Sequence, residues 1–204
     1  MYSLDRRPSR LFAQDSTTVK IPLRFFTDAE ALIVAAAASR VMPSDETGPG
    51  AREAGVVIYI DRQLAGPWGR DARRYTQEPF DDSAAAEFGY QGAASPQRIY
   101  RQGLKQLVGF DQLPPSEQDG KLAQIEQSVF FDLLRRNTIE GMFCDPLHGG
   151  NLDLLGWQLI GFPGPRMSNA NEIDRYRGQE FRPKPLSLVD LRQKPHRPSE
   201  DEVM

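Results

Sequence analysis

The sequence predicts an all-α fold, built as one compact helical domain with long irregular loops and extended N- and C-terminal arms. Apolar residues recur at helical spacing in several stretches, helix-start signals precede them, and no alternating β pattern stands out between turns. A length of 204 residues suits one domain with a sizeable core. We therefore expect an N-terminal arm at residues 1–22, a helical domain at 23–165 and a proline-containing C-terminal tail at 166–204.

The first two helices are predicted from a start signal and from apolar periodicity. Thr27 and Glu30 have the spacing of a capping box, so a helix should run from there to about Met42 and end before Pro43. We expect it to lie centrally, because its alanines allow close approach; its predicted apolar face is Leu32, Ile33, Ala36, Ala37 and Val41. A second amphipathic helix is expected from Ala51 to Leu64, with a polar face of Arg52, Glu53, Asp61 and Arg62.

Residues 65–95 are predicted to form a long ordered loop over a surface. Five large aromatic residues lie in this stretch, and aromatic residues at this density favour burial. They are Trp68, Tyr75, Phe80, Phe88 and Tyr90. Pro96 fits the first turn of a third helix whose apolar face would be Tyr100, Leu104, Leu107 and Val108. A fourth helix should restart near Ser116 and run to about Arg136 with a wide apolar surface.

A fifth helix is expected near Asn151, which can cap it, with Asp153 in the first turn. Gly161 and Pro163 should end this helix. The tail after residue 165 has many charges and few large apolar residues, so it should either wrap another surface or stay disordered.

Composition narrows the classes of function. The net charge is −3, without the basic bias that phosphate-backbone binding needs, so we expect no nucleic-acid partner. The apolar, charge-free run that begins at Ala31 stops at Arg40, about half the ~20 residues of a membrane helix, so no direct membrane span is expected. The single cysteine, Cys144, excludes a disulfide within the chain and a thiolate-rich metal site built by this chain alone.

Candidate chemistry gathers near Cys144, and each feature has a simpler interpretation. Cys144 with Asp145 and His148 could form a nucleophile and its base, but a lone cysteine is more often an inert buried thiol. Asp145 and His148 could ligate a metal, yet a structural hydrogen bond is more common. Gly149-Gly150-Asn151 could cradle an anion, although such a sequence usually forms a tight turn. We therefore expect no catalytic, cofactor-binding or metal-ligating residues, and the wide apolar faces and the arm favour a chain that another protein covers.

Three segments resemble the gluconate 2-dehydrogenase subunit 3 family. They are residues 26–30 (FTDAE), residues 41–66 (VMPSDETGPGAREAGVV through IDRQLAG) and residues 141–164 (GMFCDPLHGGN followed by GWQLIGFPG). Together with the intervening helices, the resemblance covers about residues 24–165. It departs from the family at His148, Leu152 and Gln158, where members often have Tyr, a basic residue and Lys.

The resemblance implies a non-catalytic small subunit of a membrane-associated, flavin-dependent dehydrogenase of sugars, sugar acids or polyols. The large partner would be a flavoprotein of the glucose-methanol-choline (GMC) oxidoreductase type that holds FAD and, in many such complexes, an iron-sulfur cluster. A multihaem cytochrome with haem c would anchor the complex and accept electrons. The family's small subunit is associated with maturation, stability and twin-arginine export of the large subunit, which implies a periplasmic location.

The sequence also suggests where the partner is contacted and how export is arranged. Arg6 and Arg7 have a faint twin-arginine look, but residues 13–18 are polar where a signal peptide is apolar, so we expect export on a partner's signal or a chain already matured. The residues expected at the partner interface, or supporting it, are Asp145, His148, Asn151, Trp157 and Phe162. The alternatives are a stand-alone enzyme that uses Cys144, Asp145 and His148, and a general helical adaptor or export chaperone.

Overall fold

The structure is a computed structural model that describes residues 21–72, 78–81, 83–166, 168 and 170–193. These residues form helices joined by loops and contain no strand beyond one isolated bridge, Asp45 to Gly48, which confirms the all-α prediction. The longer helices are α1 (Asp28–Val41), α2 (Val56–Ala65), α3 (Pro96–Gln106), α4 (Pro115–Ile125) and α5 (Val129–Phe143). Short helices follow, α6 (Leu155–Ile160), α7 (Ala170–Arg175) and α8 (Leu188–Gln193), with 3-10 turns η1 (Ala86–Phe88), η2 (Phe110–Gln112), η3 (Pro146–His148) and η4 (Leu152–Leu154).

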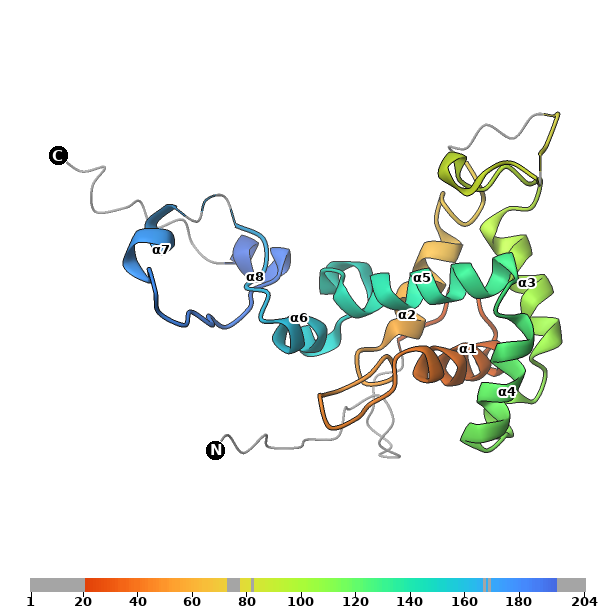
Figure 1. Cartoon of the computed structure of the whole chain (residues 1–204), viewed down its shortest axis with the longest axis horizontal. Coiled ribbons are helices and arrows are strands. Elements are labelled where there is room, and N and C mark those ends of the chain that lie inside the picture. The colour runs from red at the N-terminus through yellow and green to blue at the C-terminus, as the bar shows by residue number, and fades with distance from the viewer. Residues whose placement is uncertain (1–20, 73–77, 82, 167, 169, 194–204) are drawn as a thin grey trace.

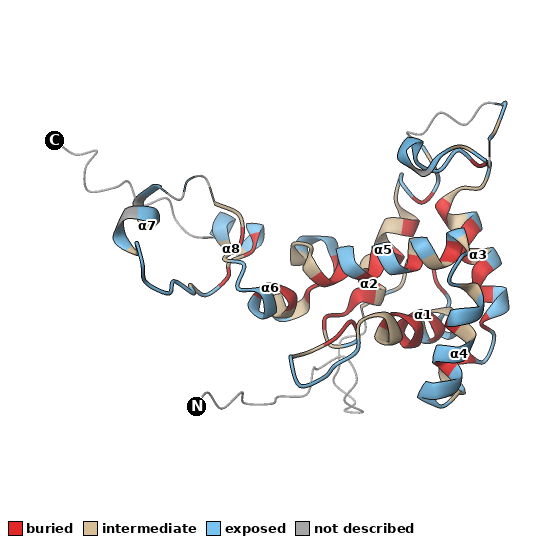
Figure 2. Cartoon of the chain, in the orientation of Figure 1, coloured by how far each residue is buried: buried red, intermediate tan, exposed pale blue. Residues whose placement is uncertain are grey.

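Helices α1 to α5 pack into one bundle, and α1 lies at its centre (Figure 1). The predicted capping box is present, since the Thr27 hydroxyl accepts from the Glu30 amide and the Glu30 carboxylate accepts from the Thr27 amide. The run from Ile33 to Ala38 is buried on every side, as the red ribbon of α1 indicates (Figure 2). Leu32 was wrongly placed on the buried face: it is 54% exposed. Burial around the whole helix reflects contacts with α2, α4, α5 and η2, which a single apolar stripe does not capture.

Helix α2 begins at Val56, five residues later than predicted, because residues 51–55 form turns that end at the left-handed Gly55. The prediction that Asp61 lies on a polar outer face is wrong. Its side chain is buried and accepts backbone hydrogen bonds from Arg24, Phe25 and Phe26 at 2.7–2.9 Å. A buried carboxylate is tolerated here because three amide donors satisfy it.

Helix α3 begins at Pro96 as predicted, with the Ser95 hydroxyl accepting from the Arg98 amide. Val108 is not part of its buried face and is 73% exposed, because α3 ends at Gln106 and Gly109 takes a left-handed conformation. The predicted fourth helix is two helices. Ser128 caps α5 by accepting from the Phe131 amide, so α4 and α5 are separated at residues 126–128 and α5 continues to Phe143.

The loop after α2 is less buried than its aromatic content predicts. Trp68, Phe88 and Tyr90 are all exposed, whereas Phe80 is half-buried. Tyr75 lies outside the described residues. Trp68 and Tyr90 line a hollow on the surface between α3 and α5 rather than enter the core.

The chain leaves the bundle after α5 and continues through α6 into an extended arm that carries α7 and α8 (Figure 1). The arm turns back toward α6, where the Leu186 amide donates to the Pro163 carbonyl at 3.2 Å. Ser187 caps α8 by accepting from the Asp190 amide, and the Asp190 carboxylate accepts from the Ser187 amide. Predictions about residues 1–20, including the Arg6-Arg7 pair, lie outside the described part of the chain.

Candidate partner-binding site

The three sequence segments of the resemblance meet in space. Asp61 of the second segment binds the backbone of Phe25 and Phe26 at the first. The third segment joins the second where the Leu152 amide donates to the Ala54 carbonyl at 3.0 Å and the Leu152 side chain lies over Gly55. Residues 140–164 therefore pack against the turn before α2 and against the end of α5.

Glycines make this mounting possible by letting backbones touch. A β-carbon on Gly150 would lie 2.1 Å from the Gly141 carbonyl oxygen, and one on Gly156 would lie 2.0 Å from the Met142 carbonyl oxygen. A residue with a β-carbon cannot fit at such distances, so both positions require glycine. The glycine spacing in this segment thus reflects backbone contact with the last turns of α5, not an anion cradle.

Asn151 holds the loop together from inside. It is fully buried, its Nδ2 donates to the Cys144 carbonyl at 2.8 Å, and its Oδ1 accepts from the Gly156 amide at 2.8 Å. The prediction that the helix begins near Asn151 is wrong by four residues, because Asn151, Asp153 and Leu154 take left-handed conformations and α6 begins only at Leu155. Asp153 accordingly lies before the helix and not in its first turn, whereas Gly161 ends α6 as expected.

Trp157 and Phe162 form an aromatic pair with one buried and one exposed member. The Trp157 indole is buried and donates to the Phe143 carbonyl at 2.7 Å. Phe162 packs edge-on against it, with ring centroids 5.0 Å apart, and remains 40% exposed. Trp157 is thus a support that ties α6 to α5, and Phe162 is a surface residue that it positions.

Asp145 connects the segment to the C-terminal arm. Its Oδ1 caps η3 by accepting from the Leu147 amide at 2.9 Å, and its Oδ2 accepts from the Leu188 amide at 2.8 Å. Gly164 brings the arm equally close, since a β-carbon there would lie 2.0 Å from the Leu186 carbonyl oxygen. One carboxylate therefore fixes both the loop and the start of α8.

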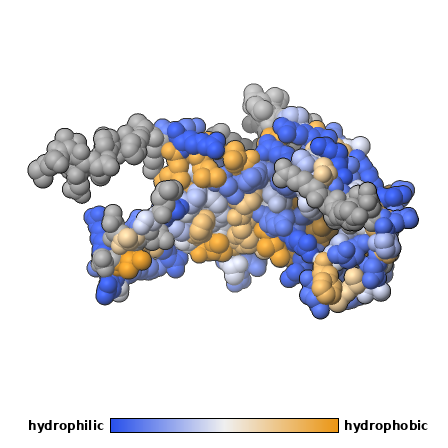
Figure 3. Space-filling view, turned by 90° about the horizontal axis from the view of Figure 1, so that it is seen from above, coloured by the Kyte–Doolittle hydropathy of each residue, from blue (hydrophilic) through white to orange (hydrophobic). Residues whose placement is uncertain are grey.

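The outer side of the segment is apolar. Its exposed residues include His148 at the end of η3 and four large apolar side chains, which we call the apolar surface: Leu147, Leu159, Ile160 and Phe162. Further exposed apolar residues lie on α8: Leu188, Val189 and Leu191. Figure 3 shows apolar side chains gathered over the middle of the molecule, where α6 and α8 lie between two polar ends. Exposed apolar groups in this number are typical of a surface that a partner covers.

Sequence reasoning selected Asp145, His148, Asn151, Trp157 and Phe162 but missed the other three members of the apolar surface, Leu147, Leu159 and Ile160. The structure brings all five into one segment and divides them, with Asn151 and Trp157 inside, His148 and Phe162 outside, and Asp145 under the arm. The length of α6 could have indicated two of the missed residues. Leu159 and Ile160 follow the buried Trp157 in a helix that is too short to bury two faces.

Cys144 does not have the setting of a catalytic nucleophile. Burial raises the pKa of the thiol to about 11, so it stays protonated at neutral pH. The thiol donates to the Gly141 carbonyl at 3.6 Å, and no hydrogen bond among the described residues joins it to His148, which is exposed. The same residues hold no cluster of three or more potential metal ligands.

Among the helices described, none combines the length and apolar character needed to cross a bilayer. The fold and the site together define a small all-α protein in which glycines and buried polar groups hold an apolar surface outward. A family model described as gluconate 2-dehydrogenase subunit 3 matches residues 28–164, and the chain belongs to that family. The family is one of accessory subunits of a dehydrogenase complex. No curated protein and no solved structure matches the chain.

Proposed function

We propose that this chain is the non-catalytic small subunit of a flavin-dependent, GMC-type dehydrogenase of sugars, sugar acids or polyols. The observation that carries the proposal is the apolar surface, Leu147, Leu159, Ile160 and Phe162, which is exposed although the loop beneath it is fixed by Asn151 and Trp157. A rigid apolar surface loses little entropy on association, so it suits a permanent subunit interface. Binding the native large subunit would stabilise that subunit by mass action.

Family membership supports the remaining assignments in the proposal. The large subunit would hold FAD and an iron-sulfur cluster, and a multihaem cytochrome carrying haem c would complete the assembly. The small subunit would assist maturation and twin-arginine export of the large one, and the complex would lie in the periplasm at the inner membrane. The small chain would contribute no cofactor-binding residue.

The test is co-purification of the tagged chain from its native host, with mass spectrometry and an absorbance spectrum of the eluate. We expect a stoichiometric large partner with a flavin spectrum. Ile160→Asp places a charge on the apolar surface and should weaken capture at least tenfold, because an unpaired charge would be buried at the interface. Val108→Asp changes an apolar residue outside this surface that is 73% exposed, against 58% for Ile160, and is the matched control.

Four results would contradict the proposal. The chain could elute alone and colourless, or Ile160→Asp could capture the flavoprotein as well as Val108→Asp does. A transient, substoichiometric complex would instead favour the adaptor or chaperone alternative. Turnover by the isolated chain that is lost in Cys144→Ala would favour the stand-alone enzyme.

A further inference from the structure

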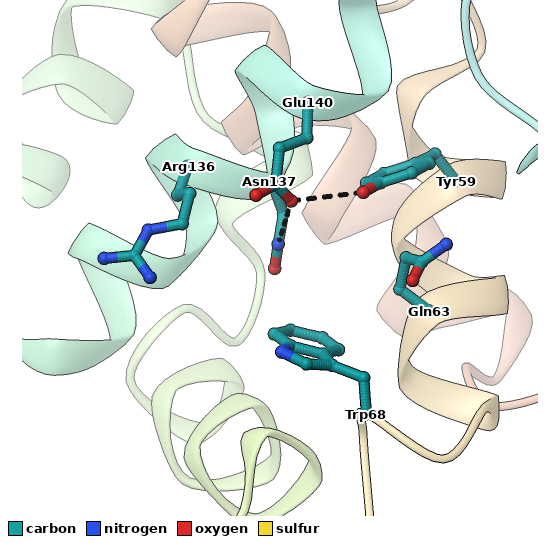
Figure 4. Close-up of a pocket in the computed structure, with 6 residues that line it drawn as sticks. All are labelled: Tyr59, Gln63, Trp68, Arg136, Asn137 and Glu140. Carbon is teal, nitrogen blue, oxygen red and sulfur yellow. Dashed lines mark hydrogen bonds between the residues drawn. The ribbon is translucent and has the colours of Figure 1, made fainter. Parts of the chain in front are cut away.

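A second site lies between α2 and α5. It is a cavity of about 270 Å³ whose third wall is Trp68, in the loop after α2 (Figure 4). Six residues line it: Tyr59, Gln63, Trp68, Arg136, Asn137 and Glu140. This volume is near the ~300 Å³ lower end of small-molecule sites, so it suits one small molecule and not a polymer.

A hydrogen-bond network fixes the floor of the cavity. Glu140 Oε2 accepts from the Tyr59 hydroxyl at 3.1 Å and from Asn137 Nδ2 at 2.9 Å, and Asn137 Oδ1 accepts from the buried Tyr100 hydroxyl at 2.9 Å. Burial, and then the charge of Glu140, raises the pKa of Tyr59, so its hydroxyl remains a donor at neutral pH. Asn137 is 1% exposed, which makes the network part of the core. The polar groups at the floor are therefore held in fixed positions.

Several polar groups around the cavity take no part in this hydrogen-bond network. The Gln63 amide, the Arg136 guanidinium and the Trp68 indole N–H make no hydrogen bond or ion pair with the described part of the chain, and Glu140 Oε1 accepts none. Figure 4 shows these donors and acceptors, from α2, α5 and the loop after α2, around the Trp68 ring, which is 39% exposed, with the Arg136 guanidinium at one end and directed away from Gln63.

We propose that this cavity binds a small polyhydroxylated molecule, a single sugar or polyol unit. Vicinal hydroxyls are both donors and acceptors, so they match a mixture of planar amide, guanidinium and carboxylate groups. The C–H face of such a molecule can pack on the Trp68 ring. The lining disfavours other ligands, because Arg136 repels a simple cation, Glu140 repels a simple anion, and an apolar ligand would leave the fixed polar floor without partners. This site does not depend on the proposed docking function.

The test is a titration of the ¹⁵N-labelled full chain followed by NMR. The chain has two tryptophans, so two indole N–H signals are expected, and Trp68→Phe assigns them. Glucose, mannitol and gluconate are the probes, and propionate is the control without hydroxyls. We expect the Trp68 signal to shift saturably with a Kd on the order of 1 mM, while the Trp157 signal, which belongs to a buried indole on α6, stays fixed.

Neighbouring arginines provide a matched pair of variants. Arg135 and Arg136 are both exposed on α5, but only Arg136 lines the cavity. Arg136→Ala should weaken polyol binding roughly fivefold or more, whereas Arg135→Ala should change it less than twofold. Tighter binding of gluconate than of glucose, lost in Arg136→Ala, would identify a sugar acid as the ligand, and equal binding a neutral sugar or polyol.

The proposal is overturned if none of the three polyols gives a saturable Trp68 shift, or if propionate gives the same shift. Equal weakening by the Arg135 and Arg136 variants would also overturn it. Because the titration uses the chain alone and a cavity distant in sequence from Ile160, its failure can be told apart from failure of docking to a flavoprotein.

Discussion

The α1–α5 bundle and the part of the chain from Cys144 onward are built in different ways. In the bundle, helices of 10–15 residues bury apolar faces, and the buried polar groups Asp61 and Asn137 join elements far apart in sequence. Beyond Cys144, α6, α7 and α8 have six residues each. Helices of that length are not stable alone in water, so tertiary contacts must hold them.

The difference shows how a small chain can be stable and still offer an apolar surface. The bundle supplies the core, and its last helix provides the carbonyl groups of Phe143 and Cys144 to which Trp157 and Asn151 bind. The segment after it buries few apolar residues in a core of its own, so Leu159, Ile160 and Phe162 remain exposed to solvent. We expect variants in the bundle to act on global unfolding and variants in the later segment to act locally.

The largest effect is expected at Asp61, in the bundle. Asp61→Ala would leave the Arg24, Phe25 and Phe26 amides without an acceptor and should lower the free energy of unfolding by at least about 3 kcal/mol. Urea unfolding followed by circular dichroism measures the change. Asp132→Ala, at an exposed position in the first turn of α5, should cost less than about 1 kcal/mol. Equal losses in the two variants would mean that the Asp61 contacts add nothing special to the bundle.

Asn151 tests the segment beyond the bundle at its most buried point. Asn151→Ala removes two hydrogen bonds and puts alanine at φ 48°, and it should lower stability by about 2–4 kcal/mol. Asn151→Gly removes the same bonds without the backbone strain and should lose less. Urea unfolding gives the totals, and hydrogen exchange of α6 shows where the loss falls. Protection lost throughout α1 to α5 would contradict the division into two regions.

The accuracy of the sequence-based predictions differs between the bundle and the segment that follows it. The helix-start signals at Thr27 and Pro96 are local, so the starts of α1 and α3 were predicted closely. Asp61 could not be predicted as buried. Its partners are the amides of residues 24–26, and the helical periodicity of the sequence shows only that position 61 carries a charge. In the site, the five residues were selected through the family resemblance, and their role at a partner interface stays a prediction. Their separation into inside and outside depends on left-handed residues at 151, 153 and 154 that periodicity does not reveal.

Two helical glycines of the bundle should respond with opposite signs. A β-carbon on Gly103 of α3 would lie 2.1 Å from the ring of Phe130, so Gly103→Ala should lower stability by about 1–3 kcal/mol through overpacking. Gly120 of α4 has nothing within 4 Å of that position, and Gly120→Ala should raise stability by about 0.5–1 kcal/mol. Thermal unfolding of both variants is the measurement. A stabilised Gly103→Ala would show that α3 and α5 can separate without loss.

The smallest and most local effect is expected where the arm joins the body. Asp145→Ala removes the acceptor for the Leu147 and Leu188 amides and should destabilise η3 and α8 by about 1 kcal/mol, because both contacts are exposed. Hydrogen exchange of the Leu188 amide should then become roughly five times faster, while global unfolding changes by less than about 0.5 kcal/mol. Asp153→Asn removes a nearby exposed charge that makes no hydrogen bond to the described part of the arm, and it keeps a residue type suited to its left-handed backbone, so exchange of the Leu188 amide should stay as in the parent chain. If Asp145→Ala lowered global stability instead, the arm would be part of the cooperative core and the two regions would be one.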